Sequence, residues 1–293
     1  MSITALILCL AGGYLLRKIV RRDKFFDLLG VLTNDVLLSF FVFGSVASKE
    51  LSFLISVRVV FLAVVLVLLV NLGGCYVYKR LALKDDRPWA TALLVLAIFP
   101  NSAALGYPLV SLFVSDLAPA VIFSQVNFML VLPLAIFILN RQQNEGSSLK
   151  SGLVKTLSTP SVGANLLALL AVVTRFPVPG QLLSVFVFVG KWSLPLMLIY
   201  FGSRLSFQHF AWRRLLEVGV LRMLLPALLI VLALSGLERS IFYSILIETS
   251  MPPAIIAGAL LARYRVKAEE AVSVSFVLTA LTLAVFILLK LVV

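Results

Sequence analysis

Long apolar runs separated by short polar stretches dominate the chain, and most runs are close to the length that crosses a bilayer. A membrane-spanning helix needs about 20 predominantly apolar residues. The sequence therefore predicts ten transmembrane helices, at about residues 2–17, 30–48, 57–78, 89–114, 118–139, 159–175, 181–204, 213–235, 241–263 and 270–292. The fold class predicted is an all-α polytopic membrane protein.

The longest polar stretch, NRQQNEGSSLKSGLVKTLS, lies near the middle of the chain. It divides the sequence into a first five-helix unit at residues 1–139, a cytoplasmic linker at residues 140–158 and a second five-helix unit at residues 159–293. No soluble domain is predicted.

Composition supports this class. Hydrophobic residues make up 61% of the chain and charged residues only 13%, whereas about 25% of a soluble domain is charged. A soluble enzyme is therefore excluded. The chain has one histidine, His209, two cysteines in apolar runs and no ATPase motif. We therefore expect no enzyme activity, no cofactor and no metal centre.

The formal net charge of +12 does not indicate nucleic-acid binding, because basic residues of membrane proteins gather in cytoplasmic loops. With the N-terminus outside, the inner loops hold 18 Lys and Arg residues and the outer side holds 5. The charge distribution therefore predicts that both termini lie outside the plasma (inner) membrane. The first apolar run precedes its basic residues, so we interpret it as an uncleaved helix rather than a signal peptide.

The two halves share a short sequence. FGSVAS at residues 43–48 ends the second predicted helix, and FGSRLS at residues 201–206 ends the seventh. The spacing is 158 residues, or five helices, and an odd number of spans inverts orientation. The pattern predicts two inverted repeats, a common plan of secondary transporters.

Prolines interrupt two predicted helices in equivalent positions of these repeats. The fourth helix contains PNSAALGYPLV at residues 100–110, and the ninth contains Pro252 and Pro253. Proline removes a backbone donor, and unwound backbone at membrane depth must be buried in protein or line a wet cavity. Paired interruptions indicate a transporter binding site. We therefore predict that both helices are discontinuous and cross near Ala104–Pro108 and Met251–Ala254.

Several motifs resemble those of the auxin efflux carrier family, within the bile acid/auxin/arsenite transporter superfamily. The similar stretches are NSAALGYPLV (101–110), SLPLMLIYFGSRL (193–205), SMPPAIIAGALLARY (250–264) and VLTALTL (277–283). The resemblance implies ten helices in two inverted repeats, a scaffold domain of helices 1, 2, 6 and 7, and a transport domain with crossed helices 4 and 9. It also implies organic-anion substrates, elevator-like alternating access and a homodimer.

The sequence departs from the family pattern at three places. Ala103 stands where the motif has glycine, and Ile256 stands where asparagine is frequent. The second helix has Leu37, Leu38 and Ser39 in a region where proline is usual. These changes predict a less polar site than in typical members, so the usual small dicarboxylate substrate does not follow.

Four ionisable residues fall within predicted spans: Asp35, Lys191, Arg222 and Glu248. Each costs about 2.5–3.5 kcal/mol at a helix centre and is a functional candidate. We interpret Arg222 as structural, either snorkelling to the inner interface or paired with Glu217. Lys191 and Glu248 are expected to pair near the midplane, either to exchange with a substrate carboxylate or as a structural pair. Asp35 and Glu248 are candidates for coupling to a proton or sodium ion.

The sequence thus favours a secondary transporter for an organic anion, with membrane lipids and a second copy as partners. The alternative is a membrane sensor or lipid-binding regulator on a transporter-like fold. The predicted substrate-binding residues are Asn101, Ser102, Ala104, Gly106, Pro108, Lys191, Glu248, Met251, Pro252 and Pro253.

Overall fold

The computed structural model describes residues 2–83, 86–143, 149–204 and 211–292. Throughout these ranges the regular structure is helical, apart from one isolated bridge between Pro100 and Pro253. Three features of the sequence lie outside the described residues: His209, residues 144–148 of the predicted linker, and residues 205–206 of the second repeat copy.

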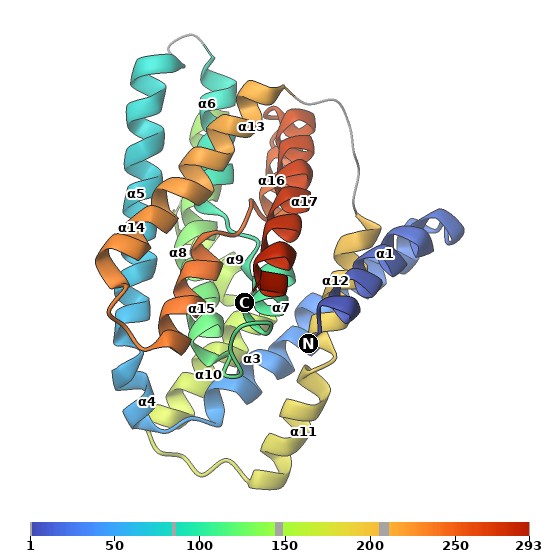
Figure 1. Cartoon of the computed structure of the whole chain (residues 1–293), viewed down its shortest axis with the longest axis vertical. Coiled ribbons are helices and arrows are strands. Elements are labelled where there is room, and N and C mark those ends of the chain that lie inside the picture. Colours follow the sequence, from blue (N-terminus) through green and yellow to red (C-terminus); the bar gives the residue numbers. More distant parts are fainter. Residues whose placement is uncertain (1, 84–85, 144–148, 205–210, 293) are drawn as a thin grey trace.

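In the first half, helical segments occupy every apolar run (Figure 1). Two of them, η1 and η2, are π-helical. The elements are α1 (Ile3–Ile19), α2 (Asp23–Val31), η1 (Leu32–Leu37), α3 (Leu38–Ala47), α4 (Leu51–Ser56), α5 (Arg58–Ala82), α6 (Arg87–Ile98), η2 (Ser102–Gly106), α7 (Tyr107–Val110) and α8 (Ala118–Gln142).

The second half begins inside the predicted linker, because α9 forms there and packs its Gly152 against Pro133 of α8. A third π-helical segment, η3, interrupts the eighth predicted span. The elements are α9 (Leu149–Leu157), α10 (Pro160–Val173), α11 (Gly180–Gly190), α12 (Ser193–Ser203), α13 (Trp212–Val218), η3 (Gly219–Leu224), α14 (Leu225–Leu234), α15 (Arg239–Thr249), α16 (Ile255–Arg263) and α17 (Ala268–Val292).

Six of the described helices are long and apolar enough to cross a membrane, or up to seven if α9 and α10, which meet at 73°, form one bent span. The polytopic membrane class predicted from the sequence is therefore supported. Length and composition alone give fewer spans than the ten predicted, because the remaining predicted segments are short or interrupted.

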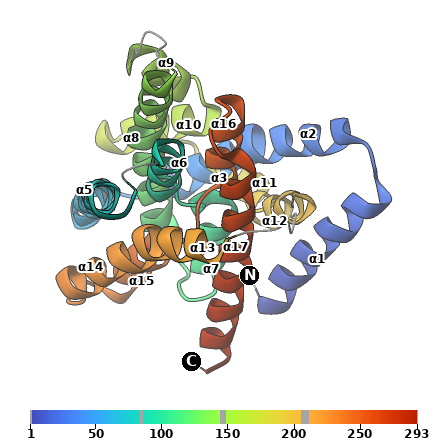
Figure 2. The same ribbon diagram turned by 90° about the horizontal axis from the view of Figure 1, so that it is seen from above.

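The helices form two groups. Figure 2 shows α1, α2, α11 and α12 on one side of the molecule and α5, α14 and α15 on the other. In the first group α1 packs closely on α12, and α3 packs on α10 and α11. Glycines allow these approaches: a Cβ on Gly13 would overlap the backbone of Ile199, and one on Gly190 would lie 2.5 Å from Cα of Phe41.

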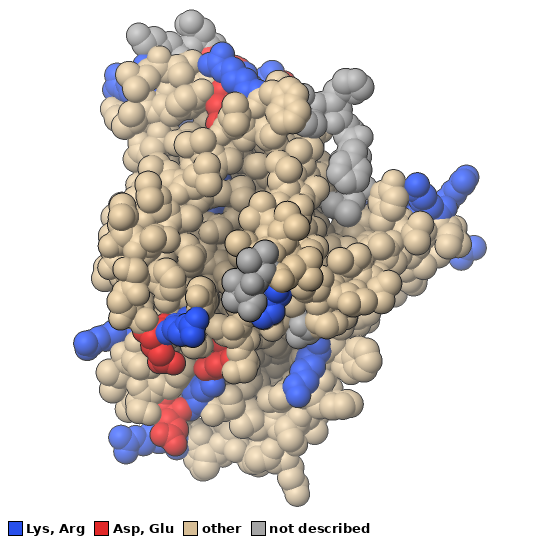
Figure 3. Space-filling view, in the orientation of Figure 1, with Lys and Arg blue, Asp and Glu red and all other residues tan. Residues whose placement is uncertain are grey.

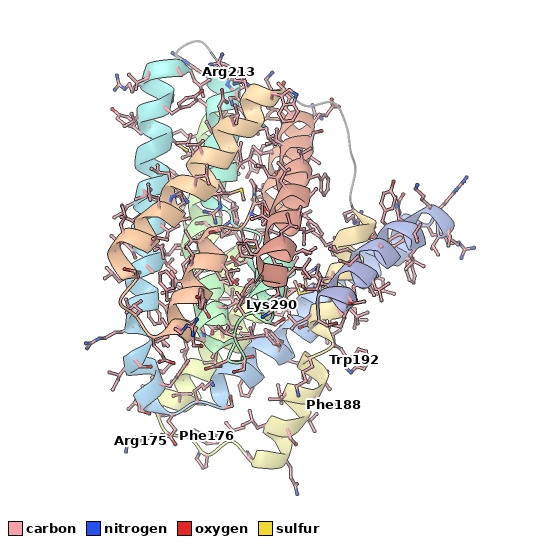
Figure 4. All side chains as sticks on the ribbon, in the orientation of Figure 1. Arg175, Phe176, Phe188, Trp192, Arg213 and Lys290 are labelled. Carbon is pink, nitrogen blue, oxygen red and sulfur yellow. The ribbon has the colours of Figure 1, made fainter. Side chains whose placement is uncertain are left out.

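The outer surface matches a bilayer environment. Figure 3 shows charged side chains at the top, at the right-hand tip and over the lower half of this face, with a broad, largely uncharged area on the left between the top and the lower groups. The side chains of Phe188 in α11 and of Trp192 just before α12 point outward and are 68% and 57% exposed (Figure 4). Exposed large apolar side chains along a helix are typical of a surface that faces lipid or another protein.

Candidate functional site

The two proline-containing helices are both broken, as predicted, and their breaks touch. The first gap, residues 99–101, separates α6 from η2, and the second, residues 250–254, separates α15 from α16. The backbone N–H of Asn101 donates to the carbonyl of Pro252 at 2.8 Å, and the N–H of Ala254 donates to the carbonyl of Phe99 at 2.9 Å. These bonds fix two unwound segments to each other in the protein interior.

The contact lies a few residues earlier in the first helix than the predicted Ala104–Pro108. Pro100, rather than Pro108, sits at the break. Pro108 lies in the first turn of α7, and the preceding π-helical turn has wider i→i−5 bonds, such as Tyr107 N–H to the Ser102 carbonyl. This shift in hydrogen bonding accommodates the missing amide of Pro108, so no gap opens there.

Backbone groups freed by the first break have found partners. Asn71 of α5 is buried and donates through Nδ2 to the carbonyl of Ala97 at 2.8 Å. In a continuous helix that carbonyl would accept from Asn101, whose N–H instead crosses to Pro252. An unpaired carbonyl at this depth would cost several kcal/mol. Asn71 therefore stabilises the broken geometry.

A cavity of about 610 Å³ lies beside the crossing, between the two helix groups. One wall comes from η1, α3, α10 and α12, and the other from the break after α6, η2, α8 and α16. Its polar lining residues are Asn34, Asp35, Asn101, Ser102, Ser124, Gln125, Asn127, Thr159, Ser161 and Tyr200.

Charged groups lie at distinct places around this cavity. Lys155 of α9 and Arg263 at the end of α16 line it and are exposed, and neither forms an ion pair within the described residues. Asp35 lines the cavity from η1 and is only partly exposed. The cavity therefore has free cations at an accessible edge and one carboxylate in its wall.

The structure brings together only part of the predicted site. Asn101, Ser102 and Ala104 line the cavity together with Asp35. The Nδ2 of Asn101 and the Oγ of Ser102 are buried without hydrogen-bond partners. The remaining predicted residues of the two breaks do not line the cavity but form the buried layer behind its wall: Gly106, Pro108, Glu248, Met251, Pro252 and Pro253.

The three departures from the family pattern all reach this cavity. Ala103, Ile256 and Leu38 each contribute to its lining. All three contribute apolar side chains to its wall.

The predicted pair of Lys191 and Glu248 is not formed. Lys191 follows the last residue of α11 and is exposed on the outer surface, and it does not line the cavity. Glu248 is 0% exposed in the last turn of α15. The prediction was wrong because α11 presents this turn to the outside, next to the exposed Trp192.

The expected pair of Arg222 and Glu217 is also absent. Glu217 instead accepts from Arg213, Arg214, Tyr78 and Trp89. Arg222 is fully buried in η3, and all three guanidinium nitrogens lack a hydrogen-bond partner. Its positive charge attracts the Glu248 carboxylate through space, although no hydrogen bond or ion pair within 4.0 Å joins the two side chains. Glu217 does not pair with Arg222 because two arginines of its own helix already hold its carboxylate.

Other cavity residues were not predicted. Ser124, Phe128 and Leu132 recur every four residues along α8 and face the cavity together, and this spacing in the sequence would have indicated a shared face. Gln125 and Asn127 of the same helix also line the cavity. Tyr200, Lys155 and Arg263 carried no signal, because their roles depend on how distant helices pack.

Comparison with protein families shows that the family described as "Membrane transport protein" matches residues 1–289. No curated protein matches the chain. The match extends over both helix groups, both breaks and the cavity, and it agrees with the auxin efflux carrier resemblance of the motifs.

Proposed function

We propose that this chain, which belongs to the membrane transport protein family, is a secondary transporter that moves an organic anion by alternating access. The observation that supports this most is the cavity of about 610 Å³ beside two crossed helix breaks. Its volume is within the range of small-molecule sites, about 300–1,000 Å³. Broken helices that meet in this way are typical of transporter binding sites.

An anion suits the electrostatics of this cavity. Helical structure restarts at Ser102 and at Ile255, and both residues line the cavity. The first amides of a helix have no intrahelical acceptor, and they favour negative charge. Lys155 and Arg263 add two free positive charges at the edge, which raises the local concentration of anions.

The lining favours a carboxylate with an apolar body. Donors concentrate near the crossing, where Asn101 and Ser102 have unpaired polar atoms. Phe128, Leu132 and Met197 provide apolar wall elsewhere. We therefore assign the carboxylate to the Asn101 end and the hydrocarbon part to the α8 and α12 walls. Asp35 would accept a hydrogen bond from the substrate or hold a coupled cation.

The proposal includes ten spans in two inverted repeats, with breaks in the fourth and ninth. The packing of α1 on α12 and of α3 on α10 supports this, because these pairs are equivalent if the first span corresponds to the sixth and the second to the seventh. Both termini would lie outside the plasma membrane. The cavity edge at Lys155 and Arg263 would then face the cytoplasm.

Transport would follow from movement of one helix group against the other. The cavity lies between them, so an elevator-like displacement of the group with α6, α8 and α16 would carry the bound anion across. The group with α1, α3, α10, α11 and α12 would serve as the scaffold of a homodimer. This arrangement is what the family resemblance implies.

Counterflow exchange in proteoliposomes tests the transporter proposal, with labelled benzoate compared against succinate and citrate. We expect benzoate to exchange faster than either. Asn101→Ala should slow exchange by about tenfold or more, since a hydrogen bond to a charged group contributes about 1.5–3 kcal/mol. Arg175→Gln is the control. Arg175 is exposed at the lower end of the molecule, opposite the end with Arg213 (Figure 4), and it does not line the cavity. Binding without exchange would favour the sensor or regulator instead.

A further inference from the structure

Two opposite charges are sealed in the protein next to the helix crossing. Glu248 and Arg222 are each 0% exposed. Both carboxylate oxygens of Glu248 and all three guanidinium nitrogens of Arg222 lack hydrogen-bond partners. Burying two charges costs several kcal/mol each unless close hydrogen bonds compensate, and here none does. A pair with no structural compensation indicates a functional role.

The carboxylate lies directly against the first broken helix. A Cβ on Gly106 would lie 2.6 Å from Oε1 of Glu248, so glycine is required for this approach. Ser102 lies one turn before Gly106 in η2, and it also lines the cavity. Ser102 is thus the group that connects the buried carboxylate with the substrate cavity.

Few other ionisable groups reach Glu248 from the elements that pack against α15. These elements are α5, α7, α8, α14 and η2. Tyr107 of α7 acts on Glu248, and its hydroxyl lies beside Ser124 and Gln125. The segments α14 and η2 contain no ionisable residue, and α8 has only Arg141, near its end. The ionisable residues of α5 are Arg58 at its start and several within residues 75–80 in its last turns. Arg222 of η3 supplies the positive charge that acts on Glu248.

We propose that Glu248 is a proton-binding site whose occupancy controls anion binding in the cavity through Arg222 and Ser102. This rests on the proposed transport of an anion. When Glu248 is charged, it neutralises Arg222 and the crossing has little net charge. When Glu248 is protonated, the Arg222 charge is uncompensated, because a guanidinium stays protonated, and an anion beside Ser102 is favoured.

The proton transfer requires the Ser102 hydroxyl, which has no hydrogen-bond partner in this structure, to turn toward Glu248. A hydronium ion in the cavity then gives a proton to Oγ of Ser102 and becomes water, while the Ser102 hydroxyl proton passes to an oxygen of Glu248. No bond between heavy atoms forms or breaks, and the carboxylate becomes a carboxylic acid. Since anion and proton each favour the other, the protein would move them in the same direction.

A proton fits this site better than a metal cation. The fixed charge of Arg222 repels a cation, whereas protonation merely neutralises Glu248. Among the described residues no group of three or more His, Cys, Asp or Glu side chains gathers anywhere. The described elements that pack against α15 also hold no second Asp or Glu beside Glu248.

Infrared difference spectroscopy on the protein in liposomes tests the proton site without any substrate. Between about pH 5 and pH 8, the span of greatest stability for most proteins, acidification should produce a carbonyl band of a protonated buried carboxylic acid. Glu248→Gln should remove this band, and Glu270→Gln, which alters a partly exposed carboxylate, should leave it. Absence of the band in the unaltered protein would overturn the proposal.

The coupling is tested by benzoate binding at several pH values, with affinity referred to the benzoate anion. Uptake of one proton with each anion should tighten binding by up to about tenfold per pH unit decrease. Glu248→Gln should bind tightly at every pH, because it imitates the protonated side chain. A wild-type affinity independent of pH, or a wild-type pH dependence retained in Glu248→Gln, would overturn the coupling.

Two further outcomes are separable. If Glu248→Gln does not fold, the double variant Arg222→Met/Glu248→Gln removes both buried charges, and it should fold, lack the infrared band and bind benzoate independently of pH. Retention of the band in that variant would overturn the assignment to Glu248. If benzoate binds at no pH, the proposed substrate class fails, while the infrared experiment still decides the proton site.

Discussion

Two buried glutamates of this protein, Glu217 and Glu248, have opposite surroundings. Glu217, in the last turn of α13, receives hydrogen bonds from the Tyr78 hydroxyl and the Trp89 indole, and it pairs with two arginines. Glu248, in the last turn of α15, has no hydrogen-bond partner for either oxygen. Both are carboxylates in apolar helices, and burial alone does not distinguish them.

The difference separates stabilisation from function. A buried carboxylate with every acceptor position used holds several helices together, and Glu217 joins α5, α6 and α13. A buried carboxylate without partners stabilises nothing, and is retained only where its charge can change. Glu217 therefore belongs to the rigid framework, and Glu248 to the part that responds to ligands.

Removing the Glu217 charge should give the largest stability loss. Glu217→Gln leaves the Arg214 guanidinium, which also contacts Asp86 and the Trp89 ring, without its buried partner. Breaking one side of such a pair typically costs about 3–5 kcal/mol. Thermal and denaturant unfolding in detergent micelles would measure this loss. Glu238→Gln serves as the control, because Glu238 is exposed and forms no ion pair within the described residues, and it should stay within about 0.5 kcal/mol of the unaltered protein.

If Glu217→Gln unfolds at the same temperature and denaturant concentration as the unaltered protein, the hydrogen-bonded cluster around Glu217 is not structural. The comparison between the two glutamates then fails. Benzoate affinity in folded Glu217→Gln should remain unchanged in either case, because Glu217 does not line the cavity.

The sequence predicted the class of fold and the two breaks well. Apolar runs mark helices because lipid and core both require satisfied backbone groups, and Pro252 and Pro253 disrupt a helix wherever they occur. The location of the first break was less predictable. Pro100 and Pro108 lie in one apolar run. Only the hydrogen bond from the Ala254 N–H to the Phe99 carbonyl shows that Pro100 is the proline at the gap.

Side-chain partnerships were hardest to predict from the sequence. Lys191, Arg222 and Glu248 all lie within apolar runs, and a charge there needs a partner or a route to water. The sequence does not say how each helix is rotated about its axis. That rotation places Arg222 inside and Lys191 outside, and so the pair expected from depth alone was wrong.

A smaller effect is expected from Gly106→Ala, which tests how closely the helix backbone approaches Glu248. The added methyl would lie within 2.6 Å of Oε1, and overpacking of this kind typically costs about 1–3 kcal/mol. In a Glu248→Ala background the methyl has room, so its cost should fall. A double-mutant cycle by thermal unfolding measures the coupling, expected at about 0.5–3 kcal/mol for residues in contact. Additive effects would contradict the contact.

The smallest effect is expected from Lys191→Met, because Lys191 lies outside both glutamate environments. Its side chain is exposed on the outer face with Trp192, and neither residue lines the cavity. Methionine keeps the unbranched chain without the charge, so stability should change by no more than about 0.5 kcal/mol and benzoate affinity should stay the same.

By contrast, Lys155→Gln/Arg263→Gln should weaken benzoate binding and reduce its dependence on salt, since it removes two charges from the cavity edge. Binding titrations at low and high salt compare the two variants. Weaker binding in Lys191→Met than in the double variant would return Lys191 to the anion site and reverse the assignment of cations made from the structure.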